Sequence, residues 1–142
     1  MKVRDCMSKD VQLSRPAETI REAAVKMRKI DAGVLPVEDN DRLVGMITDR
    51  DIALRAIAEG KGPDTPVGDV MSKSVRYCFD DEEIESVSGQ MGEFKIRRLP
   101  VLNRQKRLVG ILSLGDVSHA DDESSAKALR DISKPGGVHS QK

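Results

Sequence analysis

The apolar residues of this chain follow two kinds of spacing. Short apolar or alternating runs predict buried strands at 11–13, 34–37, 43–47, 75–77, 98–102 and 108–112. Apolar residues three or four positions apart predict amphipathic helices over 20–30 and 84–94, and shorter helices are predicted after Thr48 and Ser113. The chain is therefore predicted to be a mixed α/β (α+β) protein.

The predicted elements occur twice in the same order. Met7 aligns with Met71, 64 positions later, and the offset becomes 65 at Gly45 and Gly110, because the turn 103–107 holds one inserted residue. Self-similarity over roughly fifty positions indicates a duplicated supersecondary unit. The sequence thus predicts two pseudo-symmetric β-α-β-β-α repeats packed as one module.

The repeats set the predicted domain boundaries. The first repeat with its Gly- and Pro-containing linker covers 1–62, and the second repeat covers 63–120. The remaining residues, 121–142, are predicted to be a polar C-terminal tail. A short helix is predicted within it over 126–132, which Pro135 must end.

Composition narrows the class of function. Lys plus Arg and Asp plus Glu are 24 each, whereas a general nucleic-acid binder needs a net basic face. The aromatic residues Tyr77, Phe79 and Phe94 are too few for a platform that stacks single strands. No apolar run approaches the ~20 residues of a membrane span, and the N-terminal residues hold no apolar signal core. We therefore expect a cytoplasmic protein that binds neither nucleic acid nor membrane.

The chain has no recognisable catalytic or metal-binding set. Cys6 and Cys78 are far apart and neither belongs to a Cys-x-x-Cys pair, so both are predicted to be structural or surface cysteines. A metal site would need more ligands, and His119 and His139 are the only histidines. The sequence therefore predicts no metal site and no enzyme, with His119 an ordinary surface residue.

One motif ends the third strand of each repeat. Residues 45–51 and 110–116 both read Gly, two apolar residues, a hydroxyl residue, two variable residues and Asp. The hydroxyl residue and the Asp are Thr48 and Asp51 in the first copy, and Ser113 and Asp116 in the second. One interpretation is helix capping: the hydroxyl accepts a hydrogen bond from the third helical amide, and the Asp answers as in a capping box. Such a cap stabilises a helix by about 1 kcal/mol and needs no ligand.

The other interpretation of the motif is a nucleotide subsite. An ionised Asp is a pure acceptor that can take both hydroxyls of a ribose, and a helix N-terminus suits a nearby phosphate. Arg50, inside the first motif, is either a phosphate contact or a solvated charge. Two copies at matching places favour the nucleotide interpretation over capping alone.

The whole pattern resembles a tandem pair of cystathionine-β-synthase (CBS) domains, a stand-alone Bateman module. The resemblance covers about residues 1–120 and rests on three features that each occur twice. They are the Val-x-Asp-x-Met segments at 3–7 and 67–71, the Leu-Pro-Val strands at 35–37 and 99–101, and the Gly-x-x-[Ser/Thr]-x-x-Asp motifs at 45–51 and 110–116.

The resemblance implies two clefts between the repeats that bind adenosine ligands such as AMP, ADP, ATP, NAD or S-adenosylmethionine. In each cleft the Asp would take the ribose hydroxyls, and backbone of the opposite repeat would frame the adenine. One cleft would combine Asp116 and Ser113 with Ala32, Gly33 and Val34. The other would combine Asp51, Thr48 and Arg50 with Ile96, Arg97 and Arg98. Small Gly33 leaves room for a base, whereas Arg97 and Arg98 are either ligand contacts or solvated charges at the strand end.

The resemblance also implies a partner and an output. Modules of this family commonly form disc-shaped dimers, and a stand-alone module would act on an unidentified effector protein. The candidate dimer contacts are Met27, Ile30, Leu54, Ile57, Met91 and Phe94. The leading hypothesis is a non-catalytic sensor of adenosine nucleotides, and the alternative is a protein–protein interaction module whose motifs are only helix caps.

Overall fold

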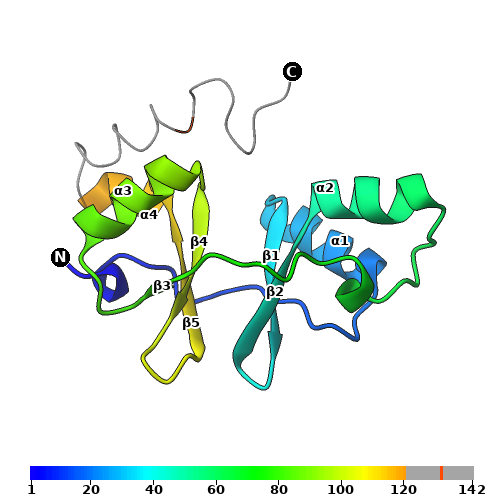
Figure 1. The fold of residues 1–142 in the computed structure, drawn as a ribbon, viewed down its shortest axis with the longest axis horizontal. Coiled ribbons are helices and arrows are strands. Elements are labelled where there is room, and N and C mark those ends of the chain that lie inside the picture. The colour runs from blue at the N-terminus through cyan, green and yellow to red at the C-terminus, as the bar shows by residue number, and fades with distance from the viewer. Residues whose placement is uncertain (121–131, 133–142) are drawn as a thin grey trace. The chain divides into compact units, whose positions relative to one another are not determined.

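The computed structural model describes residues 1–120 and residue 132, and Figure 1 shows that the chain forms two compact units. Among the described residues, unit 1 combines Met1–Val11 with the chain from Arg76 to Ala120, and unit 2 consists of Gln12–Val75. The predicted tail 121–142 lies outside the described residues apart from residue 132, and so does its predicted helix.

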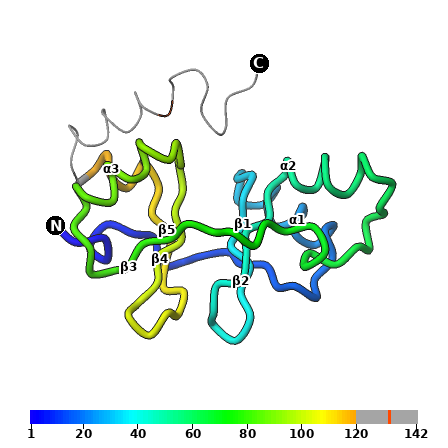
Figure 2. Tube along the Cα trace, in the orientation of Figure 1, coloured from blue at the N-terminus to red at the C-terminus, as the bar shows by residue number. Residues whose placement is uncertain are grey.

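Unit 2 is a two-stranded hairpin with helical segments before and after it (Figure 2). Its strands β1 (Val34–Asp39) and β2 (Arg42–Thr48) pair antiparallel, with Val34 opposite Thr48. Its helical elements are α1 (Ile20–Ile30), α2 (Asp49–Asp51), the π-helical stretch η2 (Ile52–Ala56), and the 3₁₀ turns η3 (Ile57–Glu59) and η4 (Val67–Asp69). Thr19 caps α1, since its hydroxyl accepts a hydrogen bond from the amide of Glu22 at 3.1 Å.

Unit 1 repeats this plan with one more strand (Figures 1 and 2). Its elements are the 3₁₀ turn η1 (Val3–Asp5), β3 (Cys78–Phe79), α3 (Ile84–Phe94), β4 (Arg98–Leu102), β5 (Leu108–Ser113) and α4 (Leu114–Ala120). β4 pairs parallel with β3 and antiparallel with β5, and Arg98 lies opposite Ser113. The mixed α+β fold predicted from the sequence is confirmed.

Each unit has its own hydrophobic core. The core of unit 2 includes Ile20, Ala23, Met27, Leu35, Val37, Ile47 and Ala56. The core of unit 1 includes Ile84, Val87, Met91, Leu99, Val101, Leu112 and Val117. Buried Met27 and Met91 therefore pack inside their own units, and their prediction as dimer contacts is wrong: their faces of α1 and α3 pack inward.

Each unit contains the first segment of the other sequence repeat. Val3 is fully buried in the core of unit 1, and Val67 in the core of unit 2. The amide of Ser8 donates to the carbonyl of Ile111 at 2.9 Å, and the amide of Ser72 donates to the carbonyl of Met46 at 2.9 Å. The compact units therefore divide the chain differently from the sequence repeats, whose boundaries stay a prediction.

We call residues 3–8 of unit 1 and 67–72 of unit 2 the crossing segments. They explain why each motif begins with a glycine. A Cβ atom on Gly45 would lie 2.7 Å from Sδ of Met71 and 2.8 Å from the carbonyl oxygen of Ser72. A Cβ atom on Gly110 would meet Met7 and Ser8 at the same two distances. Because one of the opposing atoms is backbone, a side chain at either position would displace the crossing segment.

The first predicted strand of each repeat is misplaced. The runs 11–13 and 75–77 are not strands; pairing begins at Ser14, which bridges to Val37, and at β3. Ser14 donates its amide to the carbonyl of Pro36 at 2.9 Å and accepts from the amide of Glu38 at 3.0 Å. Hydrogen bonding to β1 determines which residues here are extended. The apolar residues at 11–13 carry no information about that pairing, so the strand was predicted too early in the chain.

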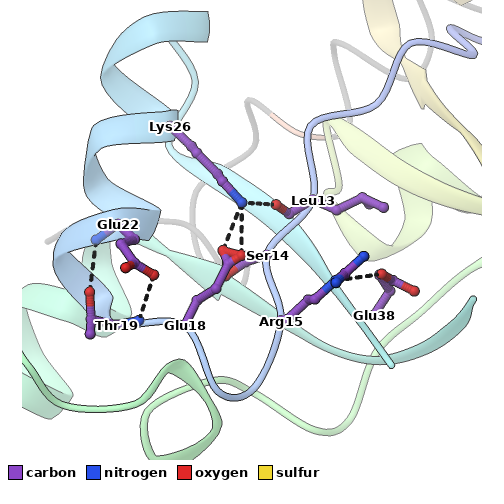
Figure 3. A network of polar contacts seen from close by, with 8 residues as sticks. All are labelled: Leu13, Ser14, Arg15, Glu18, Thr19, Glu22, Lys26 and Glu38. Atoms are coloured by element: carbon purple, nitrogen blue, oxygen red, sulfur yellow. Dashed lines mark hydrogen bonds and ion pairs between the residues drawn. The ribbon is translucent and has the colours of Figure 1, made fainter. Parts of the chain in front are cut away.

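A polar network holds the chain around Ser14 in place. Figure 3 shows Lys26 of α1 reaching the carbonyl oxygen of Leu13 at 2.7 Å and the carboxylate of Glu18 at 2.7 Å. Buried Glu38 accepts from Arg15 Nε at 3.0 Å and from the amide of Asp41 at 2.8 Å. Both oxygens of the buried carboxylate are satisfied, so this network is a structural anchor.

The helix after β2 also differs from its prediction. Leu54 and Ile57, two of the predicted dimer contacts, have exposed fractions of 49% and 60%, while Ala56 is fully buried. A π-helical stretch bonds residue i to i+5, so its side chains leave the three-or-four spacing of an α-helix. In this stretch Ala56 is therefore buried, whereas Leu54 and Ile57 lie on the surface.

We predict that Gly45→Ala and Gly110→Ala each lower the free energy of unfolding by about 1–3 kcal/mol, the usual cost of overpacking. Urea denaturation followed by circular dichroism measures the change. The matched control is Gly89→Ala in α3, where a Cβ meets no atom within 4 Å. That variant should gain about 0.5–1 kcal/mol, because Ala suits a helix better than Gly. Equal stability of all three variants would contradict the close approach.

Candidate functional site

The first motif forms a capping box at the junction of β2 and α2. The hydroxyl of Thr48 accepts a hydrogen bond from the amide of Asp51 at 2.9 Å. In return, the amide of Thr48 donates to Oδ2 of Asp51 at 3.0 Å. Thr48 keeps an extended backbone, so it is the residue at which the strand ends and the helix begins.

The second motif has the same geometry at the junction of β5 and α4. The hydroxyl of Ser113 accepts from the amide of Asp116 at 3.1 Å, and the amide of Ser113 donates to Oδ2 of Asp116 at 2.9 Å. The capping interpretation is thus confirmed for both copies. It does not exclude a ligand, because these bonds occupy only one of the two carboxylate oxygens of each Asp.

Each unit brings its motif beside the strand-start segment of the same repeat. The amide of Asp49 donates to the carbonyl of Gly33 at 2.9 Å, and the amide of Leu114 donates to the carbonyl of Arg97 at 3.0 Å. Those two carbonyls are therefore already engaged within the chain. The predicted combinations of Asp116 with 32–34, and of Asp51 with 96–98, join different units and stay predictions.

The strand-start segments differ between the repeats. A Cβ atom on Gly33 would lie 2.6 Å from Oδ2 of Asp49, so the Asp49 side chain would have to move to admit a larger residue there. Arg97 and Arg98 occupy the other segment, and both are exposed, as is Arg50 in the first motif. The exposed guanidinium groups are accessible to an anion.

The second carboxylate oxygens also have different surroundings. Oδ1 of Asp51 lies 3.8 Å from Nη1 of Arg55, with 13% of the Asp51 side chain and 50% of the Arg55 side chain exposed. Among residues 1–120, Oδ1 of Asp116 has no hydrogen bond or ion pair. Sequence reasoning missed Arg55, although an Asp followed four positions later by an Arg is a known helical pair.

The two cysteine thiols are poorly suited to nucleophilic catalysis and to metal binding. Burial raises the pKa of the Cys78 thiol to about 12, and the charges of Glu82 and Asp80 add to the shift. Burial also raises the pKa of Cys6. Because the thiolate is the reactive and metal-binding form, both thiols are unreactive near neutral pH. Within the described part of the chain, no group of three or more His, Cys, Asp or Glu is placed to hold a metal ion.

The CBS domain sequence profile matches residues 3–57 and 67–123, which include both motifs. The chain belongs to the CBS domain family. CBS domain-containing protein YhcV of Bacillus subtilis (strain 168) is 42% identical over 133 residues, which are 92% of this chain and 94% of that protein. Among the helices that the structure describes, none has the length and apolar character needed to cross a membrane.

Solved CBS-type structures share the fold. Hypoxic Response Protein I, with two coordinated zinc ions, gives a TM-score of 0.75 at 36% identity over 84% of this chain and 98% of that chain. The CBS domain pair of MJ0100, with 5-methylthioadenosine and S-adenosyl-L-methionine, has a TM-score of 0.72 and 30% sequence identity, and the match covers 87% of this chain and 97% of that chain. CBSX2 in complex with AMP has a TM-score of 0.73 and 28% sequence identity, and the match covers 86% of this chain and 96% of that chain. CBS domain pairs similar to this chain thus bind adenosine compounds.

We predict that Thr48→Ala and Ser113→Ala each lower the free energy of unfolding by about 1 kcal/mol, the usual value of an N-cap side chain. Urea denaturation of each variant measures the loss. Thr48→Ser and Ser113→Thr are the matched controls, because each keeps a hydroxyl for the cap, and they should lose less. Unchanged midpoints in both alanine variants would show that the caps are not stabilising.

Proposed function

We propose that this protein is a non-catalytic regulatory module that binds an adenosine nucleotide. The observation that carries the proposal is the repeated capping box, which holds Asp51 and Asp116 while leaving one carboxylate oxygen of each outside the cap. A fixed carboxylate can accept charge-assisted hydrogen bonds from the hydroxyls of a ribose.

The ligands of similar structures support the adenosine part of this proposal. AMP, 5-methylthioadenosine and S-adenosyl-L-methionine occur with two CBS proteins of the same fold. These compounds share adenine and ribose but differ in what the ribose carries. A subsite built on a carboxylate and a hydroxyl suits the shared part, so the proposed ligand class includes AMP, ADP, ATP and NAD.

The proposed roles follow the chemistry of each side chain. Asp116 and Asp51 take the ribose hydroxyls, with Ser113 and Thr48 beside the sugar and phosphate. The backbone of 32–34 and of 96–98 frames the adenine, as the family resemblance implies. The exposed guanidinium groups of Arg50, Arg97 and Arg98 are available to phosphate.

We expect Asp116 to contribute more than Asp51 to binding. Its second oxygen has no cation beside it among the described residues, whereas Asp51 shares its own with Arg55. Asp116→Asn keeps the shape and an acceptor for the cap but removes the charge. Charge-assisted hydrogen bonds contribute about 1.5–3 kcal/mol each, so AMP affinity should fall at least ~10-fold. Asp51→Asn should have a smaller effect.

Calorimetric titration with AMP and ATP measures these affinities. Asp64→Asn is the matched control, since it removes the same charge from an exposed loop of unit 2 and should bind like wild type. An Asp116→Asn protein that keeps the number of AMP sites and the affinities of wild type would refute the assignment of Asp116. Absence of binding to any adenosine compound would favour the alternative, an interaction module in which the motifs serve only as caps.

We also propose a homodimer as the functional assembly. Ile30, Leu54 and Ile57 of unit 2, three of the predicted contacts, have exposed fractions of 39%, 49% and 60%, so these large apolar side chains are accessible to a partner. Phe94, another predicted contact, is instead partly covered by the guanidinium of Arg76, 3.4 Å from its ring centre. A second copy is the partner that would cover the exposed residues.

Light scattering at micromolar concentration should therefore give twice the 15.6 kDa mass of one chain. Leu54→Glu with Ile57→Glu should reduce that mass toward the monomer, because burying two carboxylates opposes association. Tyr77→Glu is the control, an exposed apolar residue of unit 1. A monomeric wild type would rule out the dimer, and an unaffected double variant would rule out this surface.

A further inference from the structure

Arg55 connects the Asp51 carboxylate to the crossing segment of unit 2. Its Nη1 lies 3.8 Å from Oδ1 of Asp51 and donates to the carbonyl of Met71 at 3.3 Å. Met71 is the residue whose side chain packs over Gly45. Arg55 therefore has a fixed backbone anchor that holds its positive charge beside the oxygen that the cap leaves available.

The second repeat has no counterpart of this arrangement. At the offset of 65 that aligns the motifs, Arg55 corresponds to Ala120, and Arg50 corresponds to Gly115. The backbone differs as well: Arg55 lies in the π-helical stretch η2, whereas α4 is an α-helix. π-Helical stretches are rare and often occur at functional sites. The Asp51 subsite (Thr48 and Asp51) and the Asp116 subsite (Ser113 and Asp116) are thus chemically different.

We propose that Arg55 makes the Asp51 subsite selective for adenosine ligands that carry a phosphate, while the Asp116 subsite accepts the uncharged nucleoside more readily. This inference rests on the proposed function. A ribose hydroxyl that donates to Oδ1 of Asp51 competes with the guanidinium for the same oxygen. A neutral ligand provides no anion to replace the Asp51 contact that Arg55 loses. A phosphate can replace it, because it accepts two hydrogen bonds from one guanidinium group.

The expected effects follow from the exposure of the pair. Half of the Arg55 side chain is exposed, so its attraction to Asp51 is screened. Pairs of this kind change an equilibrium about 1.5- to 5-fold, which is the expected gain in adenosine affinity when the guanidinium is removed. A charge-assisted bond to phosphate is stronger, so AMP affinity should fall about 10-fold in the same variant.

Calorimetric titration of the Asp116→Asn protein with adenosine and with AMP isolates the Asp51 subsite. We expect AMP to bind at least ~10-fold more tightly than adenosine, and Arg55→Gln in that background to reduce this ratio at least ~15-fold. Arg55→Lys should restore part of the AMP preference, since it keeps the charge but not the planar fork. Arg21→Gln is the matched control, since Arg21 is an exposed residue of α1, and it should leave the ratio unchanged.

The outcomes separate this inference from the function on which it rests. Failure of wild type to bind adenosine or AMP would overturn both. Binding with an AMP-to-adenosine ratio that survives Arg55→Gln would overturn the role of Arg55 alone. Loss of the ratio in Arg50→Gln, with retention in Arg55→Gln, would assign phosphate selection to Arg50 instead. Thermal denaturation of each variant shows whether it is folded at the titration temperature.

Discussion

In each motif, a hydroxyl residue and the Asp three positions later form reciprocal hydrogen bonds. The ends of two strands, the starts of two helices and the proposed site all depend on these bonds. They end β2 at Thr48 and β5 at Ser113, and they start the following helices. The same bonds restrain the carboxylates of Asp51 and Asp116 before any ligand arrives. A group restrained in this way loses little freedom on binding, which is the physical advantage of preorganisation. Capping and ligand binding are therefore two uses of one geometry.

The duplication makes the differences between the units informative. Both units cap their helices alike, and both place a methionine over the motif glycine at 2.7 Å from a built Cβ. The electrostatic surroundings of the two Asp residues differ, because Arg55 has no arginine at the aligned position of the second repeat. A common scaffold with unequal charges can respond to two members of one ligand class, which is a useful property in a regulatory module.

Much of this fold can be predicted from residue spacing. The bounds of α1 and α3 follow the apolar positions closely, and Leu35 and Leu99 are buried as expected. Both capping boxes follow from the spacing of Thr48, Ser113 and their Asp partners. These predictions succeed because the interactions involved are local in sequence or follow a single period.

The failures concern partners that lie far apart in sequence. Apolar spacing predicts no element at Val3 and cannot show that Val3 shares a core with Ile84. Apolar patterning predicts a strand near Ser14 but does not show which residues pair with β1. It also does not distinguish the π-helical stretch η2 from an α-helix. The pair of Arg55 with Asp51 is local and was overlooked, whereas its bond to the carbonyl of Met71, sixteen residues away, cannot be predicted from spacing. Long-range contacts decide these features.

The central claim is that the capped Asp of each motif is part of an adenosine-ligand subsite. Amide chemical shifts of ¹⁵N-labelled protein titrated with AMP test it most directly, because the amides of Ser113 and Asp116 donate within the cap. The account predicts saturable shifts of both amides at the same AMP concentration, with little change at exposed Asp64. Saturable shifts that spare Ser113, Asp116, Thr48 and Asp51, or no shifts at all, would contradict it.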